Sequence, residues 1–85
     1  MADSAMLASV KNALGITGDA MNDTLNGYIA IVCAYMANAG VSSARIAASP
    51  FTVARGVNEV WNNDGTANFS QMFLNMVSQL VLMGD

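Results

Sequence analysis

The sequence predicts a small all-α domain, and three observations lead to this prediction. Apolar residues recur at alternating spacings of three and four over long stretches, as on one face of a helix. Turn-forming glycine, proline and asparagine residues separate these stretches. No segment alternates apolar and polar residues as a half-buried strand would. With 85 residues the chain has room for one domain, and we expect residues 1–85 to form it.

The first helix is expected at residues 4–14. Asp3 or Ser4 can cap its opening turn, and Gly15 is a natural C-terminal stop. Its apolar face combines Met6, Leu7, Val10 and Leu14.

The second helix is expected at residues 20–39, with Asp19 or Asn22 as its cap and Gly40 at its end. Its main apolar stripe is Met21, Leu25, Tyr28, Val32, Tyr35 and Ala39. The other faces are apolar as well, which is typical of a central, buried helix. Gly27 within it suggests that another backbone approaches closely at that point.

The long connection at residues 41–49 has room for one short helical turn. Ser49 followed by Pro50 is a strong start signal for a helix at residues 50–62. The buried side of this helix is expected to be Val53, Val57, Val60 and Trp61. Arg55 and Glu59 form an i,i+4 pair, which we expect on a solvated face.

The last helix is expected at residues 69–83, after the turn at residues 62–66, with Asn68 or Ser70 as its cap. Its stripe is Phe69, Phe73, Met76, Leu80 and Met83, and further apolar residues widen it beyond what one neighbour covers. The predicted core of this four-helix domain therefore consists of Leu25, Tyr28, Val32, Val57, Trp61, Phe73, Met76 and Leu80.

The composition favours assembly with other protein chains. Hydrophobic residues make up 54% of the chain and charged residues only 11%, against about 25% charged residues in an ordinary soluble domain. This is more apolar surface than a small monomer hides, so we expect some of it to be buried against partners. The longest apolar run, residues 28–37, is too short to span a membrane.

The sequence offers no recognisable catalytic or ligand site. It has no histidine, its single cysteine Cys33 lies in an apolar run, and its carboxylates lack metal-loop spacing. We therefore expect no enzyme activity, no cofactor and no metal. The net charge is −3, and the only basic residues are Lys11, Arg45 and Arg55. We therefore expect the chain not to bind nucleic acid.

Three segments are expected to supply contacts outside the subunit. The connection at residues 41–49 is long for a loop between packed helices, and it carries Arg45. The turn after the third long helix projects polar groups beside Trp61. The residues from Val81 to Asp85 end the widest apolar stripe. The candidate partner-binding residues are Arg45, Trp61, Asn63, Asp64, Val81, Leu82 and Met83.

The order of these pieces resembles the small helical head–tail connector (adaptor) proteins of tailed bacteriophages. The resemblance extends from about Met6 to Gly84 and depends on the order of several short segments: 7-LASVKNALGIT-17, 25-LNGYI-29, 34-AY-35, 54-ARGV-57, 60-VWN-62 and 73–80. It implies a virion protein that assembles in the bacterial cytoplasm as a ring of about a dozen copies beneath the portal. Such a ring extends the DNA channel without binding DNA specifically and presents a docking surface for a tail or stopper protein. The C-terminal segment would face the portal.

Two other hypotheses stay open from the sequence. The chain is alternatively a small helical protein-binding module that regulates one partner as a monomer or dimer. A third hypothesis, a membrane-disrupting peptide, is disfavoured because no cluster of lysine and arginine flanks the apolar run.

Overall fold

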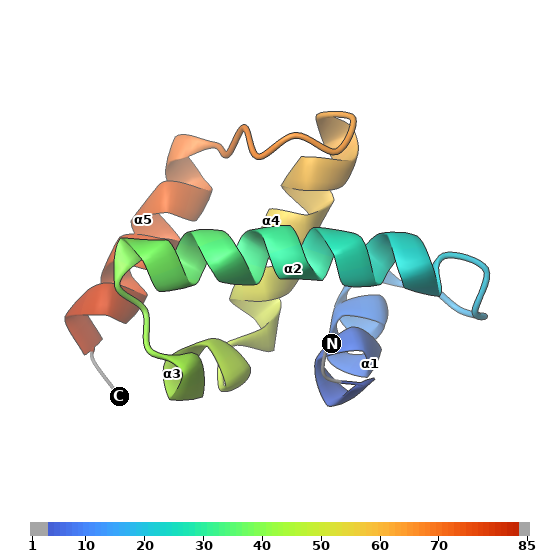
Figure 1. Ribbon diagram of the computed structural model, residues 1–85, viewed down its shortest axis with the longest axis horizontal. Coiled ribbons are helices and arrows are strands. Elements are labelled where there is room, and N and C mark those ends of the chain that lie inside the picture. The colour runs from blue at the N-terminus through green and yellow to red at the C-terminus, as the bar shows by residue number, and fades with distance from the viewer. Residues whose placement is uncertain (1–3, 84–85) are drawn as a thin grey trace.

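The computed structural model describes residues 4–83, and within them the chain is helical with no strand. Five helices follow one another: α1 (Ser4–Leu14), α2 (Asn22–Ala39), α3 (Ser43–Ala47), α4 (Pro50–Asn62) and α5 (Gln71–Met83) (Figure 1). The all-α prediction is confirmed, and each of the four long helices lies within two residues of its expected bounds. The short helix α3 is the single turn for which the sequence leaves room.

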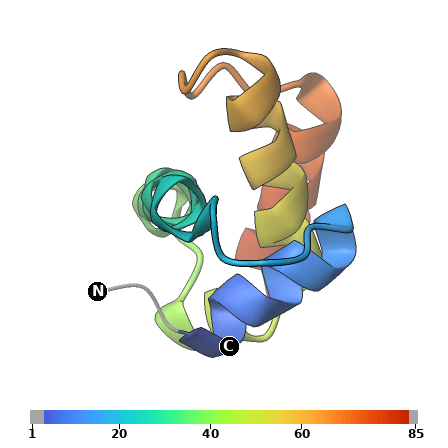
Figure 2. The ribbon, with the colours of Figure 1, turned by 90° about the vertical axis from the view of Figure 1, so that its right-hand side faces the viewer.

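Helix α2 runs along most of the length of the molecule, and α4 crosses behind it (Figure 1). Viewed end-on, α2 lies at one side of the molecule, with α1, α4 and α5 on the other side (Figure 2). α2 and α4 each contact the other four helices. The second helix is therefore central in its contacts, as expected, but the expectation that it is buried nearly all round is wrong, because its outward face is exposed.

The composition of the exposed face of α2 explains this arrangement. The buried residues of α2 are Leu25, Ile29, Val32 and Met36, so the inward face is rotated from the expected stripe. Its outward face carries small residues such as Ala30 and Ala34, which water tolerates. Gly27 is exposed and has nothing within 4 Å of an added Cβ, so the expected close approach there is wrong. The close approach is at Gly56 in α4 instead.

The core joins α1, α2, α4 and α5. Its fully buried larger side chains are Phe73, Leu25, Met36, Val10, Val32, Val53, Val57 and Val60. Four of the eight expected core residues, Leu25, Val32, Val57 and Phe73, are thus confirmed. Tyr28, Met76 and Leu80 are only half-buried. The prediction that Trp61 belongs to the core is wrong, since 39% of its surface is exposed.

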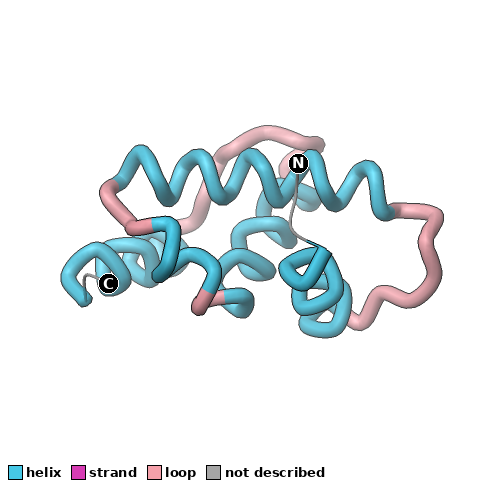
Figure 3. The backbone as a smooth tube through the Cα atoms, turned by 60° about the horizontal axis from the view of Figure 1, so that its bottom comes forward, coloured by secondary structure: helices cyan, strands magenta, loops and turns pink. Residues whose placement is uncertain are grey.

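Hydrogen bonds from a backbone N–H and to a serine hydroxyl fix the C-terminal end of α2 and the N-terminal end of α3. Gly40 has φ 107, a left-handed conformation that glycine adopts freely, and its N–H donates to the Ala37 carbonyl at 3.1 Å. The chain turns sharply there into α3, as Figure 3 shows. The Ser42 hydroxyl accepts the Arg45 N–H at 3.1 Å and caps the short helix.

The other caps divide between confirmed and wrong predictions. The Ser70 hydroxyl accepts the Phe73 N–H at 3.2 Å, so its predicted cap on α5 is confirmed. Ser49 precedes Pro50 as expected but makes no capping hydrogen bond with its side chain. Neither Asp19 nor Asn22 caps α2, and Met21 precedes that helix without a side-chain cap.

A lysine explains why Asp19 and Asn22 are not caps. The Lys11 ammonium donates to the Asn22 amide oxygen at 2.9 Å and to the Gly18 carbonyl. Asp19 accepts from the Asn22 amide nitrogen at 3.2 Å and lies 3.4 Å from the ammonium. Both side-chain oxygens are thereby used to tie α1 to the loop before α2. The expected cap at Asp3, the Ser4 side chain and the C-terminal Gly84 and Asp85 lie outside the described residues.

Candidate partner-binding surfaces

The C-terminal end of α5 exposes the apolar residues that the sequence selects. The exposed fractions are 36% for Val81, 82% for Leu82 and 58% for Met83. Val81 and Leu82 border an open groove of about 370 Å³ between α2 and α5, here called the C-terminal groove. Its other lining residues are Tyr35, Ala39, Leu74, Val77 and Ser78. No charged residue lines it.

The turn after α4 presents a second surface, built around Trp61. The indole packs in a T-shaped pair with Tyr28, with ring centroids 5.9 Å apart and an interplanar angle of 84°, and 39% of the Trp61 surface is exposed. Asp64 is exposed and holds φ 55, a left-handed conformation that aspartate tolerates in turns. The Asn63 amide nitrogen is engaged within the chain, where it donates to the Glu59 carbonyl at 2.7 Å and the Asn68 carbonyl at 3.3 Å.

The seven candidate residues do not come together in one site. Arg45 lies on α3, at the same end of the molecule as the C-terminal part of α5 (Figures 1 and 3). The last turn of α4, which carries Trp61, and the following turn, which carries Asp64, lie away from both (Figure 1). The candidate residues therefore lie on separate surfaces of the molecule.

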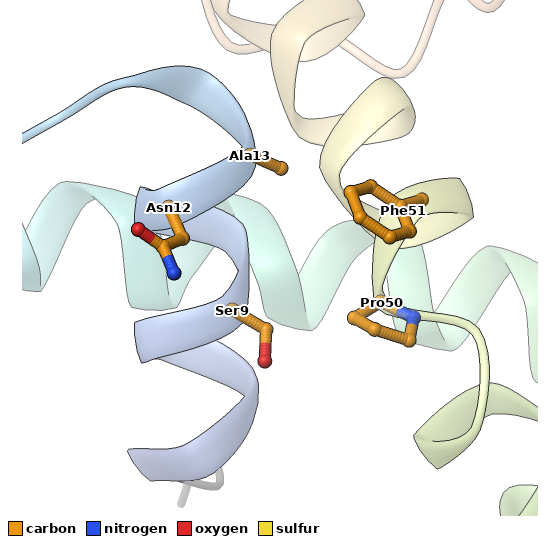
Figure 4. Close-up of a pocket in the computed structure, with 5 residues that line it drawn as sticks. All are labelled: Ser9, Asn12, Ala13, Pro50 and Phe51. Atoms are coloured by element: carbon orange, nitrogen blue, oxygen red, sulfur yellow. The ribbon is translucent and has the colours of Figure 1, made fainter.

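The most exposed aromatic side chain was not among the candidates. Phe51 in the first turn of α4 exposes 77% of its surface. It borders a groove of about 300 Å³ between α1 and α4, whose other lining residues are Ser9, Asn12, Ala13 and Pro50 (Figure 4). Helical spacing places Phe51 on the same face as Arg55, Asn58 and Asn62, which are also exposed. These polar residues at helical spacing were the sequence signal that Phe51 is exposed.

A buried carboxylate joins the end of α4 to the start of α5. Glu59 is only 8% exposed, so the expectation that it lies on a solvated face is wrong. Its carboxylate accepts the Ser70 N–H at 2.6 Å, the Ser70 hydroxyl at 2.7 Å and the Arg55 Nε–H at 2.9 Å. Because Ser70 also caps α5, this network fixes the N-terminal end of the helix that carries the C-terminal groove.

The pKa of Glu59 reflects this network. Burial raises the pKa of a carboxyl, but here the two hydrogen bonds from Ser70 and the hydrogen bond and charge of Arg55 outweigh it, and the Glu59 pKa is lowered. A lowered folded-state pKa stabilises the fold above the unfolded-state pKa, and this stabilisation is lost as the pH falls through the folded-state value.

Glu59→Gln is expected to lower the free energy of unfolding by about 1–2 kcal/mol at neutral pH, because charge-assisted hydrogen bonds are lost. The difference from the parent should shrink below a pH of about 4.5, the ordinary value for this group. Urea melts over a pH series measure this difference.

A double-mutant cycle with Ser70→Ala tests whether the two residues act together. Additive effects of Glu59→Gln and Ser70→Ala, or a Glu59→Gln difference that does not change with pH, would contradict the proposed link between α4 and α5.

The structure adds three observations on other chemistry. Burial raises the pKa of the Cys33 thiol. Within residues 4–83, no group of three or more histidine, cysteine, aspartate or glutamate residues is placed to hold a metal ion. None of the helices in that range is both long and apolar enough to cross a membrane.

Comparison with protein families, with curated proteins and with solved structures finds no match to this chain.

Proposed function

We propose that this chain is a structural head–tail connector (adaptor) subunit of a tailed bacteriophage. About a dozen copies form a ring beneath the portal, extend the DNA channel and offer a docking surface to a tail or stopper protein. The observation that supports assembly most directly is the exposed apolar end of α5, where Leu82 and Met83 keep more than half of their surfaces outside the fold. The connector role itself follows from the resemblance in the order of the sequence segments.

The exposed apolar residues support assembly because burial against another chain removes their apolar surface from water. Single exposed apolar residues are common on monomers, but adjacent ones that border a groove are typical of contact surfaces. Leu82 and Met83 are adjacent, and Leu82 borders the C-terminal groove.

The charge of the chain supports the role of a DNA conduit. Its net charge is −3, and its three basic residues are Lys11, Arg45 and Arg55. Lys11 is tied to the loop before α2, and Arg55 is paired with Glu59. A channel wall built from such acidic subunits repels phosphates, so DNA passes without specific binding.

Imaging and sizing of the purified chain test this proposal. Negative-stain images, together with light scattering across a concentration series, are expected to show closed rings, either from the chain alone or after mixing with portal assemblies. A chain that stays strictly monomeric under both conditions would contradict the connector role. A defined dimer would favour the regulatory-module hypothesis instead.

A further inference from the structure

We propose that α5 carries a methionine modification site, at which a peroxide oxidises Met72 and Met83 to sulfoxides and makes an apolar surface polar. Three methionines lie in α5, namely Met72, Met76 and Met83. At about 100° per residue they share one face of the helix, within roughly 40° of each other. These three residues are here called the methionine stripe. The inference concerns the surface of a single subunit and does not depend on the proposed ring.

The methionines of the fold divide into exposed and shielded side chains. Met72 and Met83 expose 59% and 58% of their surfaces, and Met76 is half-buried. Met36 is fully buried and Met6 is only 8% exposed, and both belong to the core. An oxidant therefore reaches Met72 and Met83 in the folded chain, but it reaches the two core methionines only when the structure opens.

The polarity of this face depends on its methionines. α5 carries no charged residue between Gln71 and Met83, so neutral side chains alone set the character of its surface. The methionine stripe is also separate from the C-terminal groove, because none of its three residues lines that groove. A sulfoxide adds a polar oxygen to each thioether that it replaces. Oxidation therefore changes this face while the core and the groove keep their side chains.

The reaction needs no group of the protein besides the thioether. The sulfur donates an electron pair to one peroxide oxygen, the O–O bond breaks, an S–O bond forms and the second oxygen leaves as water. Sulfur is oxidised by two electrons, and the peroxide is reduced by the same two. Methionine sulfoxide reductases reverse the change, so the face can return to its apolar form.

Cys33 is the competing sulfur, and mild acid suppresses its reaction. Cys33 is half-buried, and burial raises the pKa of its thiol. The thiolate is the reactive form of cysteine, so almost no Cys33 reacts at a pH of about 5.5, whereas a thioether needs no deprotonation. At that pH Glu59 keeps its charge, because its pKa is lowered from 4.5, and the hydrogen bonds between α4 and α5 persist.

Hydrogen peroxide treatment of the full chain in mild acid, followed by peptide mass mapping, measures the selectivity. Met72 and Met83 are expected to gain one oxygen each, at least about tenfold faster than Met6 and Met36. Circular dichroism should keep the helical signal of the parent, while retention on a hydrophobic-interaction column should fall. A mixture of the two classes of methionine sulfoxide reductase, one for each sulfoxide epimer, should restore the retention.

Leucine substitutions connect the retention change to these two residues. The double variant Met72→Leu, Met83→Leu keeps an apolar surface but has no sulfur at either position, so peroxide should leave its retention unchanged. Met6→Leu is the matched control, because it removes a shielded sulfur by a swap of similar volume that a core tolerates. Its retention should fall on treatment as that of the parent does.

Four outcomes would overturn the inference. If Met36 is oxidised as fast as Met72 and Met83, the fold does not select between the methionines. If the helical signal is lost on oxidation, the sulfoxides damage the fold and do not act on the surface alone. If the retention of the parent does not change, the face does not respond to the modification. If the double leucine variant responds as the parent does, other residues carry the change.

Discussion

Replacing Phe73 with alanine is expected to lower the free energy of unfolding by about 3–5 kcal/mol, because a fully buried aromatic ring is lost and leaves a cavity. The ring belongs to a cluster with Phe69, at 4.5 Å between centroids, and Tyr35, at 6.2 Å. A chain of this size has a total stability of about 4–13 kcal/mol, so the substitution removes a large fraction of it.

Urea unfolding followed by circular dichroism measures this effect, and Phe51→Ala is the matched control. Phe51 loses the same atoms but is exposed, so its replacement should change the stability by less than about 0.5 kcal/mol. Equal effects of the two substitutions would mean that Phe73 is not the centre of the α2–α4–α5 packing.

The helices could be predicted from the sequence because their signals are local. Spacing of apolar residues and punctuation by Gly40, Pro50 and the turn after Asn62 are properties of neighbouring residues. The buried face of α2 was predicted less well. This helix is apolar on several faces, so periodicity alone did not separate the Ile29 and Met36 face from the Tyr28 and Tyr35 face. Packing against α4 makes that choice.

The candidate surfaces also divide into those that local sequence signals predict and those that depend on packing between distant residues. The exposure of Leu82 and Met83 was predicted because α5 carries more apolar residues than one neighbour can cover. Phe51 was missed because it lies outside the apolar stripe of its helix and outside the three segments from which the candidate residues were taken. Glu59 was missed because its partner Ser70 lies eleven positions away, and the sequence gives no sign that the turn between them brings the two together.

Two glycines in helix interiors are expected to respond to the same substitution with opposite signs. Alanine is favoured over glycine by about 1 kcal/mol in a helix. Gly27 is exposed and an added Cβ meets nothing within 4 Å, so Gly27→Ala should stabilise the chain by about that amount. At Gly56 an added Cβ would lie 2.8 Å from the Val32 side chain and 2.8 Å from the Phe73 ring.

Neither neighbour of Gly56 has room to move, because Val32 and Phe73 are both fully buried. Overpacking typically costs about 1–3 kcal/mol, so Gly56→Ala should be destabilised by up to about 2 kcal/mol after the helix preference is subtracted. Gly56→Leu, which adds three more carbons in the same place, should lose about 3 kcal/mol or more. Urea midpoints compared at an unchanged denaturant slope measure all three variants. A Gly56→Ala variant that gains stability as Gly27→Ala does would show that α4 does not lie as close to α2 and α5 as the structure places it.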